Sequence, residues 1–572
     1  MTMWIYGDAQ RAGKTHDLAT RIAGTLDHLR AYPQGIVRHA EIVRAFVDAS
    51  ELIQGLIDAA FHQRGFDAET PEQERLTGLL FDLAKTVESS WRTGFVDQDV
   101  PAALVSAMAD FARDQPGEVT TRSAEGYSIY ALYPETYLEA ARASGLGADT
   151  IVIGIRSIGL SLSCLVAAAL NAQAPISLRP TGDPFTRRIE ADPQLLKAVL
   201  ARGEAPIAIV DEGPGLSGSS FLAVADWLEG GGVERDRIHF FPSHGGEPGG
   251  QASPEHRQRW QVAPRNTGDF DVTFLHEGRL QEWITDLLGP LDCPLQDLSW
   301  GKWKGQSDAS PVDARLERRK FLAHTSDGSF LSKFAGLGSE GQRKFDVAKT
   351  LFAAGFAVEP IATLHGMIVE RWIDSEPLTD SYDRAALLDT LVRYLALRAT
   401  LPAHNEGASL TLLADVATFN AGQAFGEEAA ESVRRLTKDA ATMQRLVHPV
   451  DTDNRLHQWE WRVSANSQLI KMDALDHSSA HDLVGCQDIA WDIAGAIVEH
   501  DLTATESSLL ISQVVSLRDR TIERDLVDLL VPCYLGFQIG LWSMALDAAA
   551  DGHKPALHHL LDCYKLRLQS LT

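Results

Sequence analysis

Cysteine is scarce in the 572 residues, and the few cysteines are widely scattered. They form no C-x-x-C pair and are Cys164, Cys293, Cys486, Cys533 and Cys563. This odd, dispersed set argues against a disulfide framework and against a structural zinc site. The first residues also lack the basic start and the apolar stretch of a signal peptide. Together these absences predict a cytoplasmic protein.

Positive charge is also in short supply, because 52 Lys and Arg residues face 78 Asp and Glu residues and leave a net charge of −26. A field of this sign repels nucleic acid and anionic membranes. We therefore expect small-molecule substrates, no nucleic-acid partner and no membrane partner, with a homodimer left open. The uncharged run at 529–546 contains Pro532 and two glycines, so we expect a buried helix there rather than a membrane span.

The length favours several domains, because one domain spans roughly 100–200 residues. Residues 1–118 carry apolar residues at three- and four-residue intervals, which is typical of amphipathic helices. In 119–250 short β-rich runs alternate with helical segments, and this order predicts a doubly wound parallel sheet. Residues 251–312 are expected to connect this unit to 313–572, where strands precede long helices. The expected fold class is therefore a multidomain protein with α/β and α+β parts.

An acidic pair followed by a loop of small residues is the most informative pattern in the chain. Residues 206–210 indicate a buried strand, which brings Asp211 and Glu212 to the edge where parallel sheets bind ligands. Residues 213–220, rich in Gly and Ser, then lead into a helix. Backbone N–H groups and hydroxyls at such a position bind phosphate, while carboxylates accept hydrogen bonds from sugar hydroxyls. The pattern predicts a sugar-phosphate site; the alternative is a plain strand–turn–helix connection.

The same segment resembles the phosphoribosyltransferase family over about residues 120–250. The resemblance implies Mg²⁺ and 5-phosphoribosyl-1-pyrophosphate (PRPP), with Asp211 and Glu212 as the catalytic pair on the ribose hydroxyls. A strand and loop at 150–159 resemble the pyrophosphate loop, and 178–189 occupies the position of the mobile loop. The residues implied to bind PRPP are Arg156, Ser157, Arg187, Arg188, Asp211, Glu212, Gly215, Ser217, Gly218, Ser219 and Ser220.

A lysine and a series of aspartates follow in the last domain. Lys333 lies in an apolar run and precedes Glu340 in the next helix, and such a lysine–glutamate pair can orient ATP phosphates. Carboxylates at the end of a strand can hold Mg²⁺, and an aspartate in a loop can accept a hydroxyl proton. The aspartates of interest are Asp451, Asp453, Asp473, Asp476, Asp488 and Asp492.

This order resembles the aminoglycoside phosphotransferase and choline kinase group of the protein-kinase-like fold. The resemblance implies that Lys333 and Glu340 bind ATP and that Asp453 or Asp451 is the catalytic base. It further implies that Asp473 and Asp476 bind the metal, while Asp488 and Asp492 brace the catalytic loop. The chain departs from the group in two places: the usual His-Gly-Asp start is absent, and Gln458 stands where Asn is expected.

Together the two resemblances predict a bifunctional enzyme, in which phosphoribosyl transfer from PRPP to a base-like acceptor is coupled to ATP-dependent phosphorylation of a small metabolite. One alternative is a PRPP-sensing regulatory protein whose kinase-like domain only binds a ligand. A second alternative is a kinase that carries a structural transferase-like domain.

Overall fold

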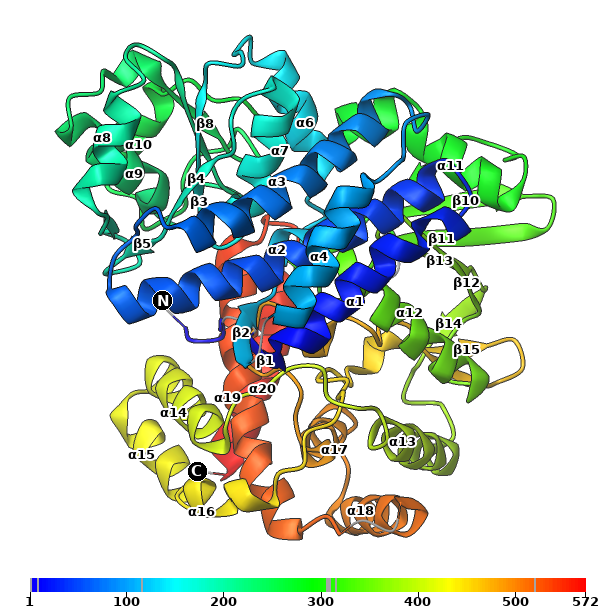
Figure 1. The fold of residues 1–572 in the computed structure, drawn as a ribbon. Coiled ribbons are helices and arrows are strands. Elements are labelled where there is room, and N and C mark those ends of the chain that lie inside the picture. Colours follow the sequence, from blue (N-terminus) through cyan, green and yellow to red (C-terminus); the bar gives the residue numbers. More distant parts are fainter. Residues whose placement is uncertain are drawn as a thin grey trace.

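The computed structural model describes residues 3–7, 10–114, 117–304, 310–313, 316–518 and 521–571. Its N-terminal region is helical, as the apolar periodicity predicts (Figure 1). The helices are α1 (Thr15–His28), α2 (Ile36–Arg64), α3 (Pro71–Arg92) and α4 (Ala102–Asp114). Helix α3 begins with a Thr70 side chain that accepts a hydrogen bond from the Gln73 N–H, followed by a proline at the first position. An antiparallel pair, β1 (Gln10–Lys14) and β2 (Glu118–Arg122), joins the two ends of this region.

A four-stranded sheet with all neighbours parallel follows, and its strand order is β4-β3-β7-β8. The strands are β3 (Ile151–Ile155), β4 (Ile176–Leu178), β7 (Ile207–Val210) and β8 (Ile238–Phe241). Every residue of β3 and β7 is buried, as expected for strands that are covered on both faces. The expected parallel sheet is therefore present.

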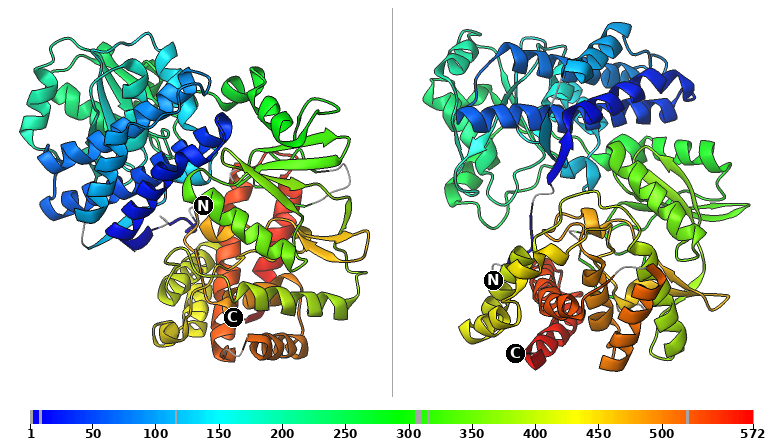
Figure 2. Two further views of the ribbon diagram at one scale, coloured as in Figure 1. Left: turned by 45° about the vertical axis from the view of Figure 1, so that its right-hand side comes forward. Right: turned by 60° about the horizontal axis from the view of Figure 1, so that its bottom comes forward.

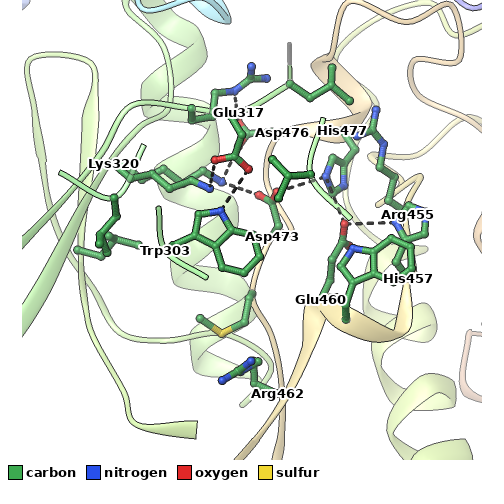
Figure 3. A pocket seen from close by; sticks show the side chains of 18 of the residues that line it. Trp303, Glu317, Lys320, Arg455, His457, Glu460, Arg462, Asp473, Asp476 and His477 are labelled. Atoms are coloured by element: carbon green, nitrogen blue, oxygen red, sulfur yellow. Dashed lines mark hydrogen bonds and ion pairs between the residues drawn. The ribbon is translucent and has the colours of Figure 1, made fainter. Parts of the chain in front are cut away.

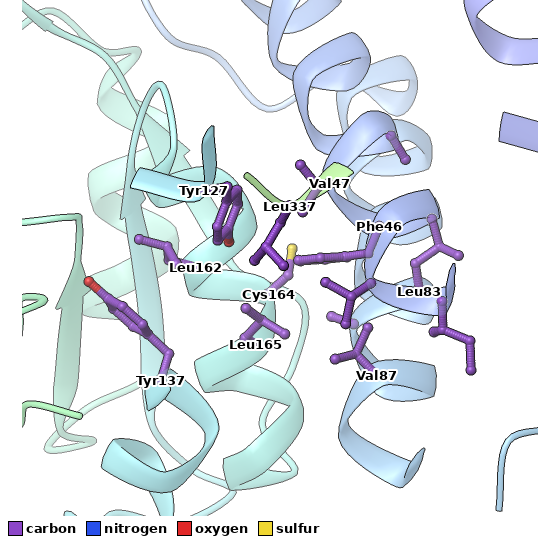
Figure 4. Packing of buried hydrophobic residues seen from close by; sticks show 14 of the residues in the cluster. Phe46, Val47, Leu83, Val87, Tyr127, Tyr137, Leu162, Cys164, Leu165 and Leu337 are labelled. Carbon is purple, nitrogen blue, oxygen red and sulfur yellow. The ribbon is translucent and has the colours of Figure 1, made fainter. Parts of the chain in front are cut away.

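Helices cover the two faces of this sheet differently. On one face, α7 (Gly159–Leu170) packs against α3 and α6 (Pro134–Ala143), and Phe46, Val87 and Leu165 meet in this layer (Figure 4). On the other face, α8 (Pro193–Leu200) and α9 (Ser219–Gly230) bury a separate apolar cluster. A small antiparallel pair, β5 (Pro180–Thr181) and β6 (Arg188–Ile189), projects from this second side next to α9.

The expected connector at 251–312 contains regular structure of its own. It forms α10 (Pro254–Val262), a π-helical turn at Asp271–His276, α11 (Arg279–Leu288) and β9 (Gln296–Asp297). Strand β9 pairs with β10 and so belongs to the next sheet.

The next sheet has five antiparallel strands in the order β12-β13-β11-β10-β9. Its longer strands are β10 (Lys320–Thr325), β11 (Gly328–Phe334), β12 (Pro360–Leu364) and β13 (Met367–Arg371), and α12 (Gly338–Ala353) lies between β11 and β12 along the chain. The start of α12 docks on α2, where the Ser339 N–H donates to Asp48 Oδ1 at 2.9 Å. A single apolar cluster runs from α1 to β13 and ties the N-terminal helices to this sheet.

A three-stranded sheet and a group of long helices complete the chain (Figure 2). The sheet contains β14 (Ser375–Pro377), β15 (Trp461–Ser464) and β16 (Leu469–Lys471). The helices are α13 (Arg384–Arg398), α14 (Leu410–Phe425), α15 (Glu427–Leu436), α17 (Ile489–Glu499), α18 (Ala504–Arg518), α19 (Arg524–Ala548) and α20 (Lys554–Leu571). Helix α19 is long and apolar enough to cross a membrane, but it packs between α14, α17 and α20, and 83% of its apolar window is buried. It is the buried helix that the sequence predicts.

Candidate functional site

A cavity of about 560 Å³ lies between the five-stranded sheet and the loops around β15 and β16 (Figure 3). Strand β11 contributes Lys333, the turn after β16 contributes Asp473 and Asp476, and the segment before β15 contributes Arg455 and Glu460. These residues come from distant parts of the chain, so the cavity exists only in the folded protein.

Lys333 is held between the two expected metal ligands. Its Nζ lies 2.5 Å from Asp473 Oδ1 and 2.7 Å from Asp476 Oδ2. Burial by itself lowers the pKa of Lys333, but the two carboxylates outweigh burial and raise the pKa above its usual value. Lys333 therefore stays a cation at any physiological pH. The Asp473 side chain keeps 42% of its surface exposed, whereas Asp476 is buried and also binds Lys344 Nζ at 2.7 Å.

The expected pairing of Lys333 with Glu340 is wrong. Glu340 lies in the first turn of α12, where it accepts hydrogen bonds from Arg343 at 2.7 Å and from Arg11 of β1 at 3.1 Å. Arg343 follows Glu340 by three residues on the same helix face, so it satisfies this carboxylate at short range. Helix α12 contributes Lys344 to Asp476 instead, and Glu340 does not line the cavity.

The two aspartates expected to act as base are buried away from the cavity. Asp453 accepts hydrogen bonds from Tyr394 Oη and His477 and lies 3.3 Å from Lys471 Nζ. Asp451 binds Arg343 at 2.7 Å and accepts from Ser478 Oγ.

Cationic neighbours dominate the charge state of both aspartates. Burial by itself raises the pKa of each carboxylate. Lys471 outweighs burial at Asp453 and lowers its pKa. At Asp451, the hydrogen bond from His404 and the charge of Arg343 lower the pKa to about 2. Neither carboxylate lines the cavity, and both take part in ion pairs that hold the loop.

The two bracing aspartates lie where the resemblance implies. Asp492 of α17 accepts hydrogen bonds from the backbone N–H groups of Asp453 and Asn454 at 2.7 and 2.8 Å. Asp488 caps α17 and accepts from the His448 N–H at 2.9 Å. These contacts fix the path of the loop that leads to Arg455.

Four residues of the loop before β15 line the cavity: Arg455, His457, Trp459 and Glu460. Of these, Arg455 and Glu460 are five positions apart. In the kinase catalytic loop, the base and the metal-binding Asn are also five positions apart. Arg455 and Glu460 share this spacing, but an arginine and a glutamate replace the aspartate and the asparagine. The sequence-based prediction counted five residues from Asp453 to Gln458, and neither of these residues lines the cavity. The start of β15 at Trp461, which directly follows Glu460, is the sequence signal for the spacing seen here.

A second cavity, of about 1080 Å³, lies at the carboxyl ends of β3 and β7. Asp211 and Glu212 follow β7 directly and line this cavity together with Ser157, Arg187, Gly215, Ser217, Ser219 and Ser220. Burial raises the pKa of Asp211 to about 8 and that of Glu212 to about 7, because no described cation pairs with either carboxylate. A cationic ligand, a metal ion or a hydroxyl-bearing ligand would stabilise the charged pair.

The small-residue loop forms the expected turn into a helix. Gly218 adopts a φ of 70°, and α9 begins at Ser219. Such a φ favours glycine, which explains why this position carries no side chain. Ser217 Oγ donates to Ser219 Oγ at 2.9 Å, and Ser219 Oγ donates to the Pro184 carbonyl at 2.9 Å.

Two of the arginines expected at this cavity have other partners. Arg156 lines the cavity, but its buried guanidinium binds Asp58 of α2 at 2.9 Å and also binds Asp67, so its charge is already neutralised. Arg188 is exposed, pairs with Glu190 at 2.6 Å and does not line the cavity. Arg187 does line it. The sequence could not reveal this difference, because Asp58 and Asp67 are about a hundred residues away from Arg156.

Comparison with known proteins finds no matching protein-family model and no matching curated protein. Solved structures do match. The choline kinase LicA from Streptococcus pneumoniae is 16% identical, with a TM-score of 0.33, over 51% of this chain and 99% of that chain. The macrolide 2'-phosphotransferase MphH from Brachybacterium faecium is 12% identical, with a TM-score of 0.32, over 49% and 97%.

The spectinomycin phosphotransferase APH(9)-Ia is 10% identical, with a TM-score of 0.34, over 50% of this chain and 97% of that chain. These matches concern kinase-like domains and extend over about half of the chain. They give no support to a phosphoribosyltransferase domain. At these identities and TM-scores, the roles of individual residues depend on the contacts described above.

Proposed function

We propose that the C-terminal half is a nucleotide-dependent phosphotransferase that acts on a small molecule. The observation that carries this proposal is the position of Lys333, on the central part of an antiparallel sheet, 2.5 Å from Asp473 at the edge of the cavity. A fixed cation for nucleotide phosphates beside a carboxylate for the metal is the core of phosphoryl-transfer sites.

The donor atoms of the cavity suit Mg²⁺. Asp473 and Glu460 both present carboxylate oxygens to it, and oxygen is the ligand that Mg²⁺ prefers. Bound Mg²⁺ would bridge nucleotide phosphates and offset their charge. Lys333 would then hold the phosphates, and Trp303 and Trp372 provide flat apolar walls in the same cavity.

Thermal unfolding of the full chain tests this proposal. Mg·ATP should raise the melting temperature, because a ligand that binds only the folded state stabilises it. Lys333→Ala should abolish the shift, while Lys349→Ala, an exposed lysine paired with Asp346, should keep it. Release of ADP with candidate acceptors then distinguishes phosphoryl transfer from nucleotide binding alone. Binding alone is the alternative, and an arginine rather than a base at position 455 favours it. A missing shift in the wild type contradicts the proposal.

A second function is favoured by the other cavity. Asp211 and Glu212 leave β7 at its carboxyl end, directly before the serine turn at the start of α9. This arrangement supports PRPP binding, with the carboxylates on the ribose hydroxyls and the turn at 217–220 on the 5-phosphate. The proposed reaction is phosphoribosyl transfer to a base-like acceptor, and Mg²⁺ would offset the charge of the pyrophosphate.

Calorimetric titration with Mg·PRPP tests this second function. Asp211→Asn with Glu212→Gln should weaken binding at least tenfold, because both carboxylates lose acceptor strength toward the ribose hydroxyls. Asp226→Asn, an exposed change on α9, is the matched control. Equal affinity of the double variant and the wild type would contradict the assignment.

A further inference from the structure

We propose that the acceptor in the Lys333 cavity is a phosphate monoester rather than an alcohol, and that it arrives from the neighbouring cavity. This inference rests on the proposed phosphotransferase function. It identifies the class of the second substrate and a reaction that supplies it.

The loop before β15 presents a cation, Arg455, to the cavity, whereas transfer to an alcohol requires a base. Arg455 cannot remove a proton, and an alcohol must lose its proton when it attacks phosphorus. Glu460 is the carboxylate of the same loop, but it is engaged by Lys471 Nζ at 2.6 Å. The two histidines that line the cavity, His457 and His477, have carboxylates within 4 Å of both ring nitrogens. A phosphate dianion needs no base, because its attacking oxygen carries no proton.

Two buried arginines around the cavity have N–H groups without partners. Arg318 is 5% exposed, and its Nε and Nη1 have no hydrogen-bond partner in the described part of the chain. The nearest carboxylate to its Nε, on Asp476, is 4.0 Å away. Arg455 is 7% exposed and has an unpartnered Nε, while its Nη2 lies 3.4 Å from Asp482.

Unpartnered buried donors are unfavourable, since they lose water and gain nothing in return. A bound phosphate would satisfy them, and the planar guanidinium group matches phosphate oxygens geometrically. The unpartnered N–H groups of the two arginines therefore form an anion site in this cavity, whereas the charge of Lys333 is already matched by Asp473 and Asp476.

The two cavities adjoin at this anion site. Glu317 and Arg318 line both of them, and the short segment 477–481 contributes His477 to one cavity and His481 to the other. A phosphate that leaves the cavity at Asp211 thus meets Arg318 before it reaches Arg455. The proposed phosphoribosyl transfer yields a product that keeps its 5-phosphate, so a reaction of this class supplies the acceptor.

The resulting step balances without a proton transfer. One oxygen of the acceptor phosphate attacks the γ-phosphorus of ATP, a new P–O–P bond forms, and the bond between the γ-phosphorus and the β,γ-bridging oxygen breaks. ADP leaves with the bridging oxygen, and the total charge of ATP and monoester equals that of ADP and diphosphate ester. Arg455 and Arg318 hold the attacking phosphate, while Lys333 holds the nucleotide.

Release of ADP by the full chain with matched acceptors tests the inference. Ribose 5-phosphate and uridine 5'-monophosphate are compared with ribose and uridine, at saturating Mg·ATP. The phosphorylated member of each pair should stimulate ADP release at least tenfold over the other. Arg455→Gln and Arg318→Gln should raise the acceptor KM at least tenfold and keep the Mg·ATP melting shift, while Arg455→Lys retains part of the affinity.

The control is Arg434→Gln, an exposed arginine far from both cavities that pairs with Glu431. Equal stimulation by ribose or uridine overturns the inference, and so does an unchanged acceptor KM in both glutamine variants. If Mg·ATP fails to shift the wild-type melting temperature, the proposed phosphotransferase itself fails. If the shift is present but no phosphate monoester stimulates ADP release, only the identity of the acceptor is refuted.

Discussion

Lys333 and Asp473 are 140 residues apart in the chain, yet the lysine Nζ donates to the aspartate Oδ1 at 2.5 Å. The contact joins β11 of the five-stranded sheet to the turn after β16, and both segments line the cavity. Both partners are the residue types that nucleotide and metal binding require.

The first prediction concerns the metal. Asp473→Asn removes one negative charge from the exposed side of the cavity, so Mg²⁺ should no longer increase the melting shift caused by ATP. Asp346→Asn, an exposed change on α12, should leave the Mg²⁺ effect intact. Differential scanning fluorimetry with ATP, with and without Mg²⁺, measures this shift. A full Mg²⁺ effect in Asp473→Asn would refute the role of Asp473 as a metal ligand.

The second prediction concerns the carboxylate of Asp492, which braces the loop at 451–460. Asp492→Ala leaves two buried backbone N–H groups without an acceptor, at a cost of about 1–3 kcal/mol each. The melting temperature of the variant should fall by several degrees. Asp389→Ala, an exposed change on α13, should shift it by less than about 1 °C. Similar melting temperatures for the two variants would show that the brace contributes little.

The third prediction concerns the anchoring of Arg156. Asp67→Ala removes one of its buried partners and leaves part of a buried charge uncompensated, which costs about 3–5 kcal/mol. Its melting temperature should fall clearly more than that of Glu190→Ala, which breaks an exposed pair worth at most about 1 kcal/mol. A Glu190→Ala effect as large as that of Asp67→Ala would contradict the burial argument.

The fourth prediction concerns pH. Burial raises the folded-state pKa of Asp211 to about 8 and that of Glu212 to about 7, so the folded protein binds these protons more tightly than the unfolded chain. Stability from this pair is present at acidic pH and is lost as the pH rises toward 8. Asp211→Asn with Glu212→Gln should therefore raise the melting temperature more at pH 8 than at pH 5. An equal difference at both pH values would show that the two carboxylates are not shifted.

Local features of the fold were predictable from the sequence, because periodicity and strand composition report burial directly. Helix α2 and the buried strand β7 followed from apolar spacing, and the bracing role of Asp492 followed from its position in the motif order. Partners of charged groups were not predictable. Glu340 pairs with Arg11, 329 residues away, and no local pattern encodes such a contact.

The loop at 451–460 shows the same limit in the position of its residues. Asp453 has the residue type of a base, but burial against Lys471 and Tyr394 removes it from the cavity. Arg455, two residues later, lines the cavity instead. A shift of two residues in a loop without regular structure changes which side chain meets the ligand, and only the three-dimensional path decides it.

The most direct test of the account is a crystal structure of the full chain with Mg²⁺ and a non-hydrolysable ATP analogue. We expect nucleotide density in the cavity of about 560 Å³, phosphate oxygens within hydrogen-bonding distance of Lys333 Nζ, and Mg²⁺ on Asp473. Nucleotide bound outside this cavity, or a cavity that stays empty at saturating nucleotide, would contradict it.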